Sequence, residues 1–204
     1  MLKWFKLLVA ILLLPACGGA VLTLGRVIQT SGGADTTWVP LLAGVACWIV
    51  VFLILPKPMW VYVLGHELTH AIWAWLFGGE VKKMKVTSSG GHVILTKTNF
   101  IISLAPYFFP LYVVLVVATF VAGNLLWDWR QQVVWFHLLL GAAYAFHVTL
   151  TFYVLRTRQS DITNEGYLFS AVIILLGNAL VLLVGLPLLT GHPSLTITFR
   201  EFWE

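Results

Sequence analysis

Charged side chains are scarce in this sequence. Its 204 residues include 12 Lys and Arg and 8 Asp and Glu, together 10% of the chain, against about 25% in an average soluble domain. Hydrophobic residues account for 60%. This composition excludes an ordinary soluble domain and favours a protein built for lipid. The net charge of +4 comes mostly from basic residues between apolar runs, a pattern of membrane anchoring, so we expect no nucleic-acid partner.

Cysteine is also rare. The two cysteines, Cys17 and Cys47, both lie inside apolar runs. Two thiols exclude a framework of several disulfides, and their apolar surroundings argue against a cysteine metal site. We expect both to be small buried hydrophobic residues.

Long apolar runs are abundant instead. A transmembrane helix needs about 20 apolar residues, and the chain contains roughly six runs near that length. We therefore predict an all-α polytopic membrane protein with about six transmembrane helices. Residues 1–58 would hold two N-terminal helices, residues 59–190 a core of four, and residues 191–204 a tail. The predicted helices are Leu7–Leu24, Trp38–Leu55, Met59–Phe77, Ile101–Ala122, Val133–Leu155 and Tyr167–Leu189.

The segment after the third run has a different character. From Val81 to Asn99 the sequence is basic and strand-like, with Gly90-Gly91 near its middle. This pattern predicts a short membrane-associated β-hairpin that turns near Gly90-Gly91. In the next apolar run, Pro106 and Pro110 are expected to kink the helix.

The third run carries the residues with the clearest chemistry. Gly65-His66-Glu67-Leu68-Thr69-His70 matches the pattern H-E-x-x-H, in which two imidazoles on one helical face can bind one zinc ion. Glu67 would lie beside the metal and act as general base toward a zinc-bound water. A charge at mid-membrane costs about 2.5–3.5 kcal/mol, which favours a functional site over an uncharged polar cluster that bonds neighbouring helices.

A catalytic zinc site needs a third protein ligand and an open position. Asp161 is one candidate, because the chain breaks around it before the last apolar run; the alternative is a solvated loop aspartate or a helix cap. His147 is the rival, and on a continuous helix it would lie about 21 Å from Asp161, so only one of the two can bind the ion. We favour Asp161 as the ligand and His147 as a hydrogen-bonded core histidine, a partner of a metal ligand or a transition-state donor. Glu165 is a weaker candidate.

These residues together resemble the site-2 protease family of intramembrane zinc metalloproteases, and its small bacterial-type members without a PDZ domain. The zinc-binding helix of that family is similar to the segment with His66, Glu67 and His70. Asp161 falls where the third ligand is expected, although Ile162 stands where the family commonly has glycine. Further similar segments are Gly78-Gly79 with Gly90-Gly91, like the glycine-marked loop of the family, and Ser103-Leu104-Ala105-Pro106, like its proline-bearing next helix.

The resemblance implies that His66, His70 and Asp161 bind Zn²⁺ and that Glu67 takes part in cleaving a membrane-protein substrate within or near the bilayer. It also implies a multi-pass protein of the bacterial inner membrane, in contact with lipid. The exposed hairpin edge near Gly90-Gly91 is expected to bind the substrate as an extended strand.

Two other functions compete with this interpretation. A non-catalytic membrane scaffold subunit could keep the fold and the metal, although loss of Glu67 would be its usual signal and Glu67 is present. A zinc transporter needs further ligands at similar depth on a neighbouring helix, and Ile101–Ala122 contains no His, Asp or Glu.

Overall fold

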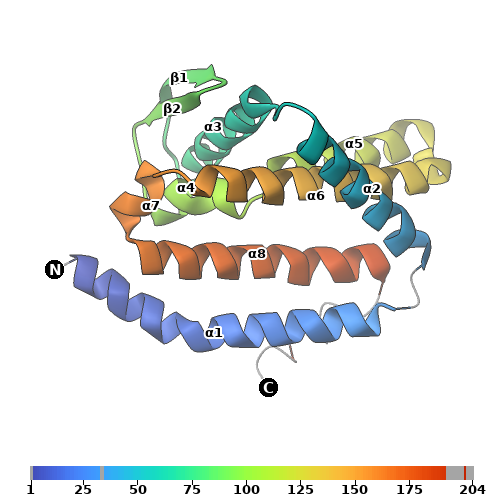
Figure 1. Cartoon of the computed structure of the whole chain (residues 1–204), viewed down its shortest axis with the longest axis horizontal. Helices are drawn as coiled ribbons and strands as arrows, with labels where there is room; N and C mark the ends of the chain where they lie inside the picture. The colour runs from blue at the N-terminus through green and yellow to red at the C-terminus, as the bar shows by residue number, and fades with distance from the viewer. Residues whose placement is uncertain (1, 33–34, 192–199, 201–204) are drawn as a thin grey trace. The chain divides into compact units, whose positions relative to one another are not determined.

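A computed structural model of the chain describes residues 2–32, 35–191 and 200. It is mainly helical with one two-stranded antiparallel hairpin, as the sequence predicted (Figure 1). The predicted tail, residues 191–204, lies almost wholly outside the described residues. The chain divides into two compact units.

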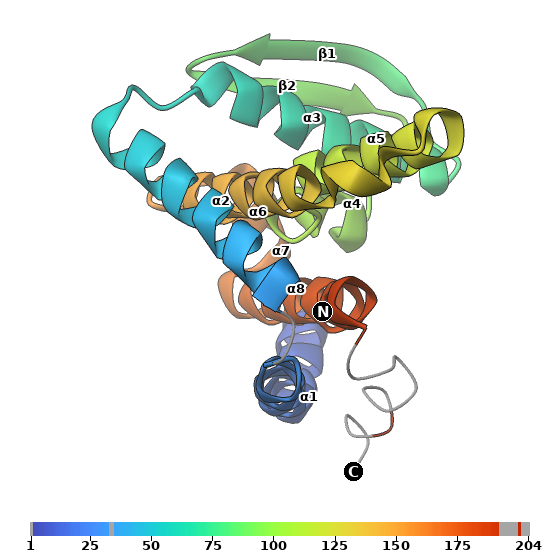
Figure 2. The same cartoon turned by 90° about the vertical axis from the view of Figure 1, so that its right-hand side faces the viewer.

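The first unit consists of α1, α7, α8 and the segment Tyr107–Phe109. The helices span Leu2–Thr30, Ser160–Glu165 and Tyr167–Thr190, and α1 and α8 lie side by side in Figures 1 and 2. A narrow stripe of mostly small side chains on α1 is buried at helical spacing, whereas most of its other large apolar side chains are exposed. The stripe is Ala10, Cys17, Ala20, Thr23, Val27 and Ser31.

The second unit, residues 36–106 and 110–158, holds the remaining elements apart from the terminal residues Asp35 of α2 and Tyr107 of η1. They are α2 (Asp35–Ile54), α3 (Met59–Leu76), β1 (Val81–Thr87), β2 (Gly90–Leu95), α4 (Phe100–Leu104), η1 (Ala105–Tyr107), α5 (Leu111–Trp127), η2 (Trp129–Gln132) and α6 (Val133–Leu155). Its hydrophobic centre is formed by Tyr62 and Val63 of α3 against Phe146 and Leu150 of α6.

The glycines of α2 and α6 allow these two helices to cross very closely. A Cβ atom at Gly44 would lie 1.9 Å from the carbonyl oxygen of Leu138, and one at Gly141 would lie 2.0 Å from that of Leu41. Small residues at a helix crossing let two backbones approach, the usual packing device of helices in membranes. Cys47, on the same α2, is exposed rather than buried, so the prediction for this cysteine was wrong.

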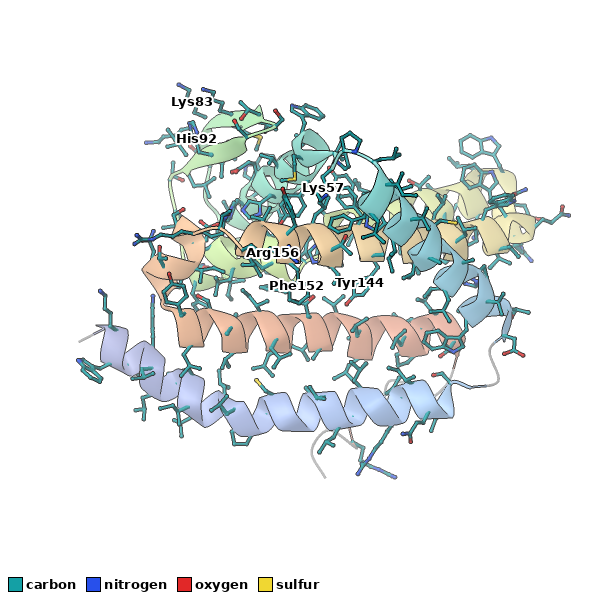
Figure 3. All side chains as sticks on the ribbon, in the orientation of Figure 1. Lys57, Lys83, His92, Tyr144, Phe152 and Arg156 are labelled. Atoms are coloured by element: carbon teal, nitrogen blue, oxygen red, sulfur yellow. The ribbon has the colours of Figure 1, made fainter. Side chains whose placement is uncertain are left out.

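The hairpin has one inner and one outer face. Met84 pairs with Val93 and Val86 with Gly91, and Val86 packs on the hydrophobic centre of the second unit. The turn is formed by Ser88 and Ser89, so Gly90-Gly91 begins the second strand instead of making the turn. Figure 2 shows the hairpin beside α3, and in Figure 3 Lys83 and His92 project from it on the outer side.

The kink predicted in the apolar run Ile101–Ala122 is a complete break of the helix. The segment Phe100–Tyr107 and helix α5 meet at an angle of 76°. Pro106 and Pro110 explain the break, because proline lacks the N–H that a continuing helix needs and clashes with the preceding turn.

Four helices of the described chain are long and apolar enough to cross a membrane, or up to five if the bent pair is one span. The predicted count of six is therefore not confirmed. Helix α3 is not among the four, because His66, Glu67 and His70 lower the hydropathy of its 18 residues. The four are Lys3–Thr30, Asp35–Ile54, Trp129–Leu155 and Tyr167–Thr190.

Candidate metal centre

The two histidines of the motif converge on α3. They are one helical turn apart, and their Nε2 atoms lie 3.2 Å from each other. His70 is buried and His66 is half-buried. Two ring nitrogens at this separation can be brought onto one cation by small side-chain rotations, since zinc–nitrogen bonds are about 2.0–2.1 Å long.

A hydrogen bond to one ring nitrogen of His70 determines which of its two nitrogens can bind a metal. Nδ1 lies 2.8 Å from the carbonyl oxygen of Ile102. A carbonyl oxygen can only accept, so Nδ1 carries the proton and the neutral ring keeps its lone pair on Nε2. This carbonyl belongs to α4, which begins at an N-cap in which the side chain of Asn99 accepts from the Ile102 N–H at 2.9 Å. Such outer hydrogen bonds orient metal-binding histidines in known sites.

Glu67 is 5% exposed and lies under the hairpin. A Cβ atom at Gly91 would lie 2.8 Å from the Oε1 atom of Glu67 and 2.7 Å from Cγ1 of Val63. The second strand can therefore pass over the carboxylate only because residue 91 has no side chain. Gly90, with φ +148°, has no atom within 4 Å of a Cβ position, so the two glycines serve different structural purposes.

Asp161 belongs to the first unit and begins a helix of its own. It lies in the first turn of the six-residue α7, not at the top of α8. The hydroxyl of Tyr107 donates to its Oδ2 atom at 2.9 Å. The amide of Asn178 donates in turn to the carbonyl of Tyr107 at 3.0 Å. The carboxylate of Asp161 is thus oriented by the buried Tyr107, whose backbone is itself hydrogen-bonded to Asn178 of α8.

The weaker ligand candidate, Glu165, has another partner. Its carboxylate forms an ion pair with the ammonium group of Lys6.

His137 and His147 are both buried on α6, and the Nδ1 atom of His137 lies 3.3 Å from the carbonyl oxygen of Thr36. His147 differs from His137, because the Nε2 atom of His147 has no hydrogen-bond partner among the described residues.

The donor atoms of the candidate ligands are of the kinds that zinc binds. Imidazole nitrogen and carboxylate oxygen are the usual ligands of catalytic zinc, and the His70 tautomer presents the nitrogen lone pair that a metal requires. Sequence reasoning did not single out Ile102, Tyr107 or Asn178, which orient the candidate ligands. Of the orienting residues only Asn99 had a recognisable signal, as an N-cap residue just before an apolar run.

No protein-family model, curated protein or solved structure matches this chain.

Proposed function

We propose that this protein is an intramembrane zinc metalloprotease, similar to the site-2 protease family, that hydrolyses a peptide bond of a membrane-protein substrate. One observation carries the proposal. On α3, the Nε2 atoms of His66 and His70 lie 3.2 Å apart, and the intervening Glu67 is buried beside them at 5% exposure. Two nitrogen ligands and a carboxylate base within five residues form the minimal machinery of metal-assisted peptide hydrolysis.

Asp161 is the proposed third ligand. It falls where the third ligand of the site-2 protease family is expected. The chain itself also supports the assignment. The carbonyl that accepts from His70 is at Ile102, and the hydroxyl that donates to Asp161 is at Tyr107, five residues further along the same short helical segment. The orienting groups of both candidate ligands therefore come from one stretch of backbone.

Each residue then has a definite role. Zinc, when bound, would acidify a water molecule and polarise the substrate carbonyl. Glu67 would accept the proton of that water and deliver it to the departing amine nitrogen, which breaks the peptide bond without leaving a charged amide anion. The hydrogen bond from His70 to Ile102 would hold its ring in one tautomer throughout the reaction.

The substrate is proposed to be an apolar membrane segment. A cavity of about 520 Å³ in the second unit is lined almost entirely by apolar side chains of α2, α3, α5 and α6, among them Trp48, Val61, Tyr112 and Phe146. Val61 and Phe146 adjoin the centre of the unit next to Tyr62, which contacts the His66 ring at 6.0 Å between centroids. Such a lining suits a hydrocarbon side chain and not a charged one.

The hairpin is the proposed binding edge for an unwound substrate. A peptide bond inside a helix is already hydrogen-bonded, so a substrate must open locally before it can be hydrolysed. An extended strand paired with the backbone near Gly90 and Gly91 would lie above Glu67, because Gly91 itself lies against that carboxylate.

The metal is tested by measuring zinc per chain in detergent-purified protein by mass spectrometry. We expect close to one zinc in the wild type and strong loss in His66→Ala and Asp161→Ala. His92→Ala and Asp128→Ala are the matched controls, because His92 is on the outer face of the hairpin and Asp128 is 72% exposed. A wild type that holds no zinc after reconstitution would refute the proposal, and a loss confined to His66→Ala would refute Asp161 as ligand.

The scaffold alternative is separated by Glu67→Gln. This variant should keep its zinc but lose cleavage of single-pass model substrates, which is followed by mass spectrometry of the new termini. Glu80→Gln, at an exposed position before β1, should keep both. A wild type that binds zinc yet cleaves none of a broad substrate panel would favour a scaffold subunit.

A further inference from the structure

His147 is the one histidine on α6 whose burial has no evident structural explanation. The residue is 7% exposed, and its Nε2 atom has no hydrogen-bond partner among the described residues. An unsatisfied buried polar group costs about 1–3 kcal/mol. Such groups call for an explanation, and a catalytic role is one of the recognised ones.

The packing of α6 on α3 determines what His147 faces. The hydroxyl of Tyr62 donates to Thr151 Oγ1 at 3.3 Å, and the rings of Tyr62 and Phe146 lie 6.5 Å apart. His147 lies one helical turn before Thr151 on the same face of α6, and His66 lies one turn after Tyr62 on the same face of α3.

These positions place His147 and His66 on the facing sides of α6 and α3. His147 is nevertheless not in the group of side chains that could share a metal ion with His66 and His70. It is therefore beside the candidate metal centre without belonging to its ligands.

We propose that His147, through its Nε2–H group, donates a hydrogen bond to the carbonyl oxygen of the peptide bond being cleaved. The inference rests on the proposed protease function and adds a residue to it. Negative charge develops on that oxygen when water attacks the carbonyl carbon, and the neutral imidazole stabilises it without transferring its own proton. A fixed donor aimed at a developing oxyanion typically contributes a factor of about 10²–10³ to the rate.

This role explains why the group is buried and unpaired. A donor that acts only when substrate is present must have no competing acceptor in the resting protein. Burial also increases its effect, because electrostatic interactions are stronger where water is excluded. The binding of the substrate carbonyl would supply the missing partner.

The test uses full-length zinc-loaded protein and a phosphinic dipeptide with leucine side chains, whose tetrahedral oxygens imitate the attacked carbonyl. Zinc content and the phosphinate dissociation constant are measured for the wild type, His147→Phe and His147→Gln. His137→Phe is the control, as a second buried histidine on α6. We expect normal zinc in every variant, with phosphinate binding weakened about ten- to a hundredfold in His147→Phe alone. The amide nitrogen of glutamine should restore most of the affinity.

Each other result has a clear meaning. Unchanged phosphinate binding in His147→Phe overturns the proposal, as does a glutamine variant no better than phenylalanine. Zinc loss in His147→Phe would make the residue a ligand or a structural support, which also overturns it. If the wild type binds no zinc, the proposed function itself fails, and the zinc measurement shows this before any inhibitor is added.

Discussion

Gly91 on β2 lies directly against Glu67 on α3, so that a Cβ atom at position 91 would come within 2.8 Å of the carboxylate oxygen Oε1. The candidate general base and the hairpin strand are therefore in direct contact. A larger side chain at position 91 must displace the carboxylate of Glu67, and a shift of Glu67 must displace the strand.

The first prediction concerns Gly91→Ala. The added methyl group must displace Glu67 or Val63, so we expect the stability to fall by about 1–3 kcal/mol. A misplaced base should lower the cleavage rate by about a hundredfold, while zinc remains bound. Thermal unfolding, zinc content and cleavage measure the three effects. Gly185→Ala, where a Cβ would meet nothing within 4 Å, should change none of them; a Gly91→Ala protein of normal activity would contradict the close contact.

The second prediction concerns the hydroxyl of Tyr107, which donates to Asp161 at 2.9 Å. Tyr107→Phe removes this hydrogen bond and leaves the ring in place. We expect zinc affinity to fall about 10- to 100-fold, as when other orienting partners of metal ligands are removed. Competition with a chromophoric chelator measures the dissociation constant. Tyr153→Phe, at a position 39% exposed, should bind zinc normally, and equal affinity in both variants would argue against Asp161 as ligand.

The third prediction concerns the cap of α4. Asn99→Ala removes the acceptor for the Ile102 N–H, which should cost about 0.5–2 kcal/mol. Because the Ile102 carbonyl orients His70, zinc affinity should fall as well, by less than in Tyr107→Phe. Asn99→Asp and Asn99→Ser keep an N-cap oxygen and should recover both properties. An alanine variant that loses stability but binds zinc as tightly as the wild type would show that α4 does not position His70.

The fourth prediction concerns the effect of zinc on unfolding. A ligand that binds only the folded state at about 100 times its dissociation constant stabilises that state by about 2.7 kcal/mol. The unfolding temperature in detergent should therefore rise with added zinc and fall with a chelator. His66→Ala should respond to neither, whereas His92→Ala should respond like the wild type. An equal response in the two variants would place the metal elsewhere.

Much of the local structure could be predicted from the sequence, because its signals are local. Pro106 and Pro110 predicted the bend after α4, and the strand-like segment after Gly79 predicted the hairpin. The motif on α3 predicted the convergence of His66 and His70, since residues four apart share a helical face.

The remaining features depend on residues that are distant in sequence. Tyr107 and Asp161 are 54 positions apart, and no periodicity connects them. Likewise, Gly91 looked like a turn residue, and only the packing of β2 on α3 reveals its contact with Glu67. The predicted number of membrane spans stays unconfirmed, because run length does not register the polar residues that make α3 less apolar than its neighbours.

The crossing of α2 and α6 at Gly44 and Gly141 has a consequence for how this chain can change over evolutionary time. Leu, Ile and Val on the exposed apolar surfaces can replace one another at little cost, so these positions can change freely. At these two positions even the smallest additional carbon would collide with the opposite backbone. Distant descendants of this chain should therefore be recognisable by this pair of glycines, together with H-E-x-x-H, when little else of the sequence still aligns.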